Sequence, residues 1–248
     1  MVCGDSGIVD KAVEVAMGLK DELAAEVEET FSTQWEVQKT IAVSAPDDLR
    51  LNANHAKDLE TATVLYADLD GSTNMVDNFG WTFSAEVYKT YLRCAAEVIK
   101  SENGVITAYD GDRVMAVFTG NLKNTSAVRC ALKINFAVCK IIRPALSEQY
   151  PSKEFTLKHV VGIDTSRLRI ARIGVRGDND LVWIGRAANY AAKLTTLSDK
   201  ATWITKSVYD KMHDNVKYSN GMNMWEARTW TPMSNLPVYC STYWWKIP

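Results

Sequence analysis

The clearest hydrophobic pattern along the chain is a buried run that ends in two carboxylates. Residues 63–67 (TVLYA) are β-branched, aromatic or small and apolar, which predicts a buried strand. Residues 68–73 (DLDGST) predict a turn and the start of a helix. Carboxylates at the exit of a buried strand are costly unless positive charge balances them, and Mg²⁺ is a natural partner for their oxygens. The alternative is that Asp68 and Asp70 only cap the turn and the helix.

The next elements form a helix and a hairpin. Apolar positions recur at three- and four-residue spacing through residues 87–98, which predicts a helix that stops at Asn103-Gly104. Residues 105–109 and 114–118 are strand-like, and the DGDR stretch between them predicts a hairpin turn. Asp112 therefore stands at the tip of a buried hairpin.

The remaining patterns continue this alternation of strands and helices. A helix is predicted over residues 123–142, ended by Pro144. Further strands are predicted at 157–163, 168–175, 181–184 and 202–205. Residues 185–194 predict a loop that leads into a helix, residues 207–212 a short helix, and the aromatic C-terminus a strand pair. Before the first strand, residues 8–30 predict a helix that either packs on its own domain or docks on a partner, and residues 32–60 a connection with short ordered pieces.

The order strand–helix–strand–strand–helix–strand indicates an α+β fold of the ferredoxin-like, split βαβ type. This fold places the first strand beside the central hairpin, so we expect Asp68 and Asp112 to face each other. Two converging carboxylates suit a two-metal site for a triphosphate. We expect an N-terminal helix and connecting segment over residues 1–55 and the main domain over residues 56–248.

Composition narrows the function classes without naming one. The net charge is −2 from 28 basic and 30 acidic residues, which gives no case for a nucleic-acid or anionic-membrane partner. No apolar run is long enough to span a bilayer, and no basic leader precedes an apolar block, so we expect a cytoplasmic protein. The five cysteines form no C-x-x-C pair, which favours reduced thiols over a zinc site.

Three stretches together resemble the class III nucleotidyl cyclase catalytic domain. They are VLYADLDGST at 64–73, GDRVMAVF at 111–118, and VGIDT at 161–165 running on to IGRAANYAAKL at 184–194. Their order and spacing agree with the family across roughly residues 60 to 205. The resemblance implies a class III cyclase catalytic domain with an N-terminal helical extension.

The resemblance also implies metal ligands and reaction chemistry. Asp68 and Asp112, assisted by the backbone carbonyl of Leu69, would bind two divalent metal ions, Mg²⁺ or Mn²⁺. The ribose 3′-oxygen would attack the α-phosphorus and pyrophosphate would leave. Backbone N–H groups of Asp70, Gly71, Ser72 and Thr73 would hold the phosphates.

In the family that this chain resembles, a second subunit completes the site, which implies a homodimer. Asn189 would orient the ribose. Lys193 stands where the family has its transition-state arginine, so the charge is kept and the planar fork is lost. The alternative for Lys193 is a solvated helix face.

The base-recognition positions depart from the purine-specific pattern. Adenine-specific members carry a lysine and an aspartate where this chain has Ala108 and Val182, and the guanine-specific glutamate is also missing. Little remains there to pair a purine edge. Tyr66, two residues before Asp68 on the same strand face, could reach a smaller base, or it could belong to the core.

This loss resembles the uridylate and cytidylate cyclases of the Pycsar antiphage systems, where a cyclic pyrimidine nucleotide activates a separate effector. The resemblance implies a pyrimidine nucleotide cyclase, with UTP favoured over CTP as substrate and the effector unidentified. The alternatives are an adenylate cyclase with unusual base contacts, a catalytically weak cyclase-like regulatory module, and a polymerase or diguanylate-cyclase relative. This chain has no Gly-Gly-Asp/Glu-Glu-Phe segment at the hairpin, which counts against the last of these alternatives.

Overall fold

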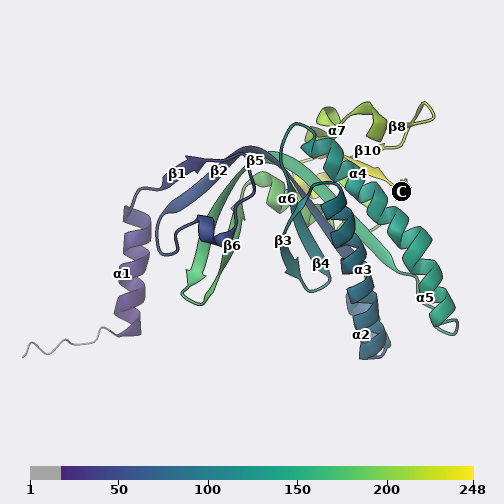
Figure 1. Cartoon of the computed structure of the whole chain (residues 1–248), viewed down its shortest axis with the longest axis horizontal. Helices are drawn as coiled ribbons and strands as arrows, with labels where there is room; N and C mark the ends of the chain where they lie inside the picture. The colour runs from purple at the N-terminus through teal and green to yellow at the C-terminus, as the bar shows by residue number, and fades with distance from the viewer. Residues whose placement is uncertain (1–17) are drawn as a thin grey trace, which may run out of the picture.

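The computed structural model describes residues 18–248, in which a mixed nine-stranded sheet carries helices on both faces (Figure 1). The α-helices are α1 (Leu19–Ser32), α2 (Ser72–Asn78), α3 (Trp81–Ser101), α4 (Lys123–Phe136), α5 (Arg143–Gln149), α6 (Arg186–Leu194) and α7 (Lys206–Lys211). The sheet strands are β1 (Glu36–Lys39), β2 (His55–Asp70), β3 (Val105–Asp110), β4 (Arg113–Phe118), β5 (Lys158–Val175), β6 (Asp178–Ile184), β7 (Thr202–Thr205), β10 (Glu226–Trp230) and β11 (Leu236–Ser241).

Smaller elements complete the chain. The strands β8 (Tyr218–Ser219) and β9 (Met222–Asn223) form a separate pair. Short 3₁₀ segments are η1 (Pro46–Asp48), η3 (Asp214–Val216) and η4 (Thr231–Met233), and η2 (Ala137–Ile142) is π-helical. No helix within residues 18–248 has both the length and the apolar character that crossing a bilayer requires.

The sheet topology agrees with the α+β expectation. The strand order is β10-β11-β7-β5-β2-β4-β3, with β1 paired to β2 and β6 paired to β5. The strand β2 is antiparallel to both β4 and β5, which confirms that the first core strand adjoins the central hairpin. The end of β2 and the tip of the β3–β4 hairpin therefore lie at the same edge of the fold.

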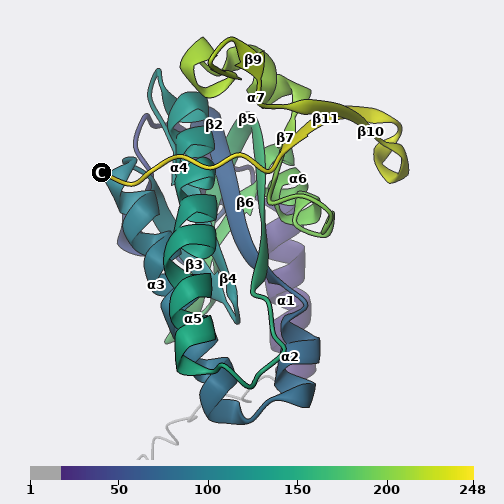
Figure 2. The same cartoon turned by 90° about the vertical axis from the view of Figure 1, so that its right-hand side faces the viewer.

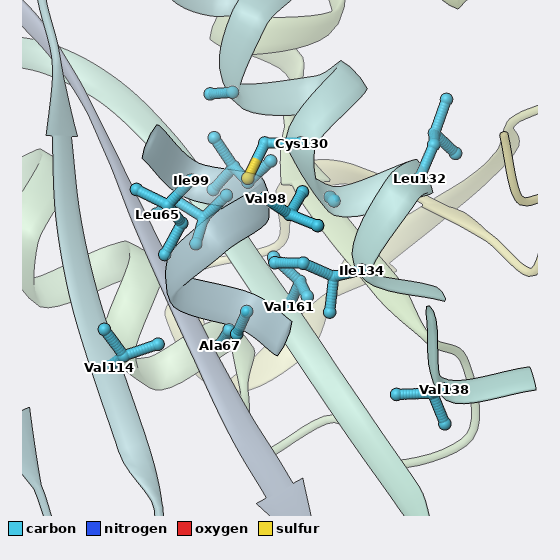
Figure 3. Close-up of a cluster of buried hydrophobic side chains, with 14 of the residues drawn as sticks. Leu65, Ala67, Val98, Ile99, Val114, Cys130, Leu132, Ile134, Val138 and Val161 are labelled. Carbon is cyan, nitrogen blue, oxygen red and sulfur yellow. The ribbon is translucent and has the colours of Figure 1, made fainter. Parts of the chain in front are cut away.

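Alternation along β2 separates two hydrophobic layers. Leu65, Ala67 and Leu69 face α3 and α4 and belong to the larger core. Val64 and Tyr66 belong to the opposite layer, with α6. Figure 3 shows Leu65 and other members of the larger core between the strands and the two helices, and Figure 2 shows α4 and α5 running along that face.

Three sequence predictions are wrong in detail. The first core strand begins at His55 rather than at residue 63, because β1 pairs with its early half and gives that half hydrogen-bond partners. Residues 158–175 form one strand, not two, since β6 continues the ladder. Pro144 does not end the helix: the π-helical turn of η2 leads directly into α5, which carries the proline and continues to Gln149.

The helix α1 stands apart from the sheet in Figure 1, and none of its residues is buried. Its C-terminal end is held by Asn54, whose amide donates to the carbonyls of Thr30 and Thr33 at 2.7 and 2.6 Å. Packing of this helix on its own domain, one of the two expectations, is therefore not found for residues 19–32. Residues 8–17 of the predicted helix lie outside the described residues.

The aromatic C-terminus forms the expected strand pair, with β10 antiparallel to β11 and both Trp225 and Trp230 buried. Four of the five cysteines, Cys94, Cys130, Cys139 and Cys240, are free thiols, as expected. Cys3 lies outside the described residues.

His159 near the start of β5 makes stability depend on pH. It is 4% exposed, its ring lies 6.0 Å from that of Tyr91, and neither ring nitrogen has a hydrogen-bond partner within residues 18–248. Burial, aided by the charge of Arg143, lowers the pKa of His159 from 6.5 to about 3. The folded protein therefore keeps this imidazole neutral where the unfolded chain would protonate it.

Because the folded-state pKa of His159 is depressed, the unfolding free energy is highest above pH 6.5, where the imidazole is neutral in both states. It decreases as the pH falls from 6.5 toward 3, where only the unfolded chain binds the proton. We expect the unfolding free energy to fall by roughly 1.4 kcal/mol per pH unit more in the wild type than in His159→Leu over this window. Urea unfolding at several pH values measures the difference. His213→Leu, which alters an exposed histidine, is the control. Equal slopes in the wild type and His159→Leu would contradict the prediction.

Candidate active site

Asp68 lies near the C-terminal end of β2, a strand whose other residues mostly belong to the core. Two residues after it, β2 ends at Asp70, and Gly71 takes a left-handed φ of +79°. That conformation suits glycine and turns the chain sharply into α2. The predicted sequence of strand, turn and helix start is confirmed, and it leaves Asp68 half-buried at the strand exit.

The environment of Asp68 disfavours its negative charge. Burial raises the pKa of this carboxyl above its ordinary value, and the charge of Asp112 raises it further. The charge of Arg113 and a hydrogen bond from the hydroxyl of Thr195, 3.3 Å from Oδ2, act in the opposite direction. A cation placed beside Asp68 would relieve both of the unfavourable effects.

Asp112 occupies the turn between β3 and β4, as the sequence predicts. Its Oδ2 atom is buried and has no hydrogen-bond partner among residues 18–248. A buried polar atom of this kind costs free energy unless a ligand satisfies it. The two carboxylates also act together on Tyr91, whose phenol pKa is raised well above its ordinary value by burial and then by Asp68 and Asp112.

These features fit divalent cations bound to oxygen. The part of the chain from residue 18 onward has no cluster of three His, Cys, Asp or Glu side chains able to hold a metal ion alone. Asp68 and Asp112 therefore supply an incomplete ligand set, which suits ions that also take backbone carbonyl, water and phosphate oxygens. The orphaned Oδ2 of Asp112 is the observation that favours a cation here.

The helix that carries Asn189 and Lys193 is fixed at its start and along its buried face. Arg186 donates to Asp164 Oδ2 at 3.0 Å and to the Thr165 carbonyl at 3.0 Å, which ties the first turn of α6 to β5. Asp164 is fully buried, so this ion pair is shielded from water on one side. Gly162 permits the close packing, since a Cβ there would lie 2.2 Å from the Ala191 carbonyl oxygen.

Asn189 and Lys193 lie on the opposite side of α6 from its packed face. The buried positions of the helix are Ala187, Ala188, Ala191 and Leu194. Asn189 and Lys193, four residues apart, are exposed, and neither side chain makes a hydrogen bond or ion pair within residues 18–248. One chain thus brings Asp68 and Asp112 together, whereas its Asn189 and Lys193 are exposed to solvent.

The predicted base positions are only partly gathered. Tyr66 and Ala108 pack in the same hydrophobic layer, and burial raises the pKa of the Tyr66 phenol, so it stays protonated as a donor. Val182 on β6 is not part of that layer, whereas its neighbours Leu181 and Trp183 are. The alternation of β6 therefore separates Val182 from Tyr66 and Ala108.

Sequence reasoning missed three residues that touch this site. The Arg113 guanidinium lies 5.5 Å from the centre of the Tyr66 ring and pairs with Asp110. The hydroxyl of Tyr91 donates to the backbone carbonyl of Asp68 at 3.3 Å. Arg113 could have been found, because period-two alternation along β4 puts it on the face of Met115, the partner of Tyr66. Neither Tyr91 nor Thr195 carries a local signal.

Comparison with solved structures places this architecture in a known class. The adenylyl cyclase CyaB from P. aeruginosa is similar at a TM-score of 0.60 and 19% identity, over 75% of this chain and 95% of that chain. The guanylyl cyclase Cya2 is similar at a TM-score of 0.64 and 17% identity, over 76% and 94%. The fold is that of a class III cyclase catalytic domain, which confirms the predicted fold class.

Curated relatives are similar over nearly the whole chain. A uridylate cyclase of Burkholderia cepacia is 62% identical over 231 residues, which is 93% of this chain and 100% of the relative. A uridylate cyclase of Xanthomonas perforans is 53% identical over 232 residues, again 93% and 100%. No protein-family model matches the chain. The chain belongs to the uridylate cyclase family, and it is a nucleotidyl cyclase, a lyase.

Proposed function

We propose that the protein converts UTP to 3′,5′-cyclic UMP and pyrophosphate, with two divalent metal ions held by Asp68, Asp112 and the Leu69 carbonyl. The buried Oδ2 of Asp112, which lacks a partner among the described residues, is the observation that carries the metal assignment. The preference for UTP is supported by the names of the relatives. When bound, Mg²⁺ or Mn²⁺ would lower the pKa of the ribose 3′-hydroxyl and offset the charge of the leaving pyrophosphate.

The residues of the chain have separate tasks in this reaction. A bond forms between the ribose 3′-oxygen and the α-phosphorus, the bond from that phosphorus to the β-phosphate oxygen breaks, and the hydroxyl proton goes to solvent. Asn189 orients the ribose, and the Lys193 ammonium stabilises negative charge on the α-phosphate. The backbone N–H groups of residues 70–73, at the start of α2, hold the phosphates.

The proposed active enzyme is a homodimer with two shared sites. Asn189 and Lys193 point away from the packed face of α6, so we assign them to the site built on the partner's carboxylates. Each subunit then contributes Asp68 and Asp112 to one site and α6 to the other. Without a partner, the proposed cation ligands would lack the groups that stabilise the transition state.

The pyrimidine base is proposed to contact Tyr66. Its protonated hydroxyl is a hydrogen-bond donor, and Arg113 over its ring restrains the side chain. Ala108 in the same layer offers no polar group to a purine edge. Val182 on β6 is likewise proposed to offer no polar group to the base.

The substrate is tested by incubating the protein separately with UTP, CTP, ATP and GTP, with Mg²⁺ and with Mn²⁺. We expect cyclic UMP as the main product, identified by mass spectrometry, and a lower kcat/KM for CTP. Tyr66→Phe should reduce the preference for UTP over ATP by about ten-fold, since a site hydrogen bond is lost. Cyclic AMP as the main product would favour an adenylate cyclase instead.

The proposed biological role is synthesis of a second messenger in antiphage defence, for a separate effector that this chain does not identify. The support is the resemblance to the Pycsar cyclases together with the uridylate cyclase relatives. Cyclic UMP measured in cells before and after phage infection tests this role. No rise in an infected strain that expresses active enzyme would contradict it.

A further inference from the structure

The hydroxyl of Thr195 joins two parts of the chain that serve different pockets of the proposed homodimer. Thr195 follows the last residue of α6 and is 7% exposed. Its Oγ1 lies 3.3 Å from Oδ2 of Asp68 and 2.8 Å from the carbonyl oxygen of Ala192. The residue thus touches a proposed metal ligand on one side and the final turn of α6 on the other.

A threonine hydroxyl carries one proton, so it can make one full hydrogen bond to these two acceptors at a time. While Asp68 lacks a cation, its carboxylate competes for the proton because charged acceptors bind it more strongly. Cations bound at Asp68 would weaken this competition and leave the proton to Ala192. The last turn of α6 would then gain a hydrogen bond to one of its end carbonyls.

We propose that Thr195 is a positioning residue that couples the cation site of one pocket to the α6 helix of the other. This inference rests on the proposed function, in which Asp68 and α6 of one chain belong to different sites. Loading of cations at Asp68 changes the hydrogen bonds at the end of α6, where Ala192 and Thr195 lie on either side of Lys193. Arg186 ties the first turn of α6 to β5, so the change affects the C-terminal end of the helix, where Thr195 lies.

The neighbouring Thr196 provides a matched control. Its hydroxyl donates to the Lys193 carbonyl at 2.8 Å, and the residue is exposed. Thr196→Val therefore removes a capping hydroxyl from the same helix end without a contact to Asp68. Thr195→Ser keeps the hydroxyl at the tested position, whereas Thr195→Val removes it with little change of volume.

The first measurement is Mn²⁺ binding to the nucleotide-free protein, followed by electron paramagnetic resonance. We expect Thr195→Val to bind Mn²⁺ about five-fold more tightly than the wild type, because the hydroxyl stabilises the cation-free carboxylate of Asp68 more than it stabilises the neutral carbonyl of Ala192. Thr196→Val and Thr195→Ser should stay within about two-fold. Equal affinities in the wild type and Thr195→Val would overturn the positioning role.

The same experiment separates this inference from the proposed function. Asp112→Ala should abolish specific Mn²⁺ binding if the two carboxylates are the ligands. Absence of binding in the wild type, or its persistence in Asp112→Ala, would overturn the two-metal proposal itself. Thermal midpoints of all variants confirm that each is folded.

The coupling between pockets is tested in a mixed dimer with one intact site. One subunit carries Lys193→Ala and supplies its carboxylates to that site, and the other carries Asp112→Ala and supplies its α6. Thr195→Val in the first subunit should lower the Mn²⁺ concentration for half-maximal activity about five-fold. If Asp112 of the second subunit is restored, the site built on that subunit's carboxylates still lacks Lys193 but can bind cations. The kcat of the intact site should then be at least about three-fold higher than with Asp112→Ala, and Thr195→Val in the second subunit should remove this difference.

Differently tagged subunits allow each mixed dimer to be purified, with Thr196→Val in either subunit as the control. A kcat that does not depend on Asp112 of the second subunit, or a dependence that survives Thr195→Val there, would overturn the coupling. A dependence of kcat on Asp112 of the second subunit that Thr195→Val removes and Thr196→Val leaves in place would support it, because that subunit's own carboxylates belong to the other, inactive site.

Discussion

Replacing Asp112 with alanine is expected to lower the turnover of UTP by at least about 10³-fold without unfolding the protein. The variant removes one of the two carboxylates that would hold the cations. It also removes a buried oxygen that has no hydrogen-bond partner among residues 18–248, so the folded state loses no bond of that atom. The measurement combines cyclase kinetics with a thermal unfolding midpoint in the absence of metal.

Asp68→Ala should show the same loss of turnover, with a midpoint at or above that of the wild type at neutral pH. Burial and Asp112 raise the pKa of Asp68, so its ionised form opposes folding, and this cost grows as the pH rises through the folded-state pKa. Asp77→Ala, which removes an exposed carboxylate from α2, is the control with wild-type turnover. Near-normal activity in either active-site variant would show that the metal ligands are misassigned.

Mixing inactive subunits should restore activity if each site is shared between two chains. Homodimers of Asp112→Ala lack a cation ligand in both sites, and homodimers of Lys193→Ala lack the cationic side chain in both. A heterodimer of the two has one site with all of its groups and one site that lacks both. An equal mixture with free exchange should therefore recover about a quarter of the wild-type activity per dimer.

The control is a mixture of Asp112→Ala with Asp68→Ala, where both changes fall on the carboxylate side. Every shared site in that heterodimer lacks a ligand, so activity should stay at background. Native mass spectrometry establishes that the subunits have exchanged. An exchanged mixture of Asp112→Ala and Lys193→Ala without recovered activity would rule out the shared site.

Local patterns were sufficient for most of the elements around the site. The apolar run before Asp68, the DGDR hairpin and the helix at residues 186–194 all form as expected, because strand alternation, turn chemistry and helical spacing are properties of short segments. The errors lie where long-range pairing overrides local signals. His55 begins β2 because β1 is present to pair with it, and a π-helical turn carries the chain into Pro144.

The candidate site shows the same division. Asp68 and Asp112 were identified from the sequence, and the pairing of β2 with β4 brings their segments to one edge. The proposed role of Val182 at the base stays a prediction. Leu181 and Trp183 share the hydrophobic layer of Tyr66 and Val182 does not, since the twist and register of β6 decide which residues face that layer. Their placement required the tertiary structure.

The sequence by itself determined the order of elements, the two carboxylates at strand and hairpin ends, and the Asn189–Lys193 pair on one helix. Each of these depends on contacts between residues close in the chain. Only the tertiary structure decided that Thr195 adjoins Asp68 and that Asn189 and Lys193 point away from the packed face of α6. The physical reason is that sheet register and helix docking are set by the burial of the whole core, which no short segment encodes.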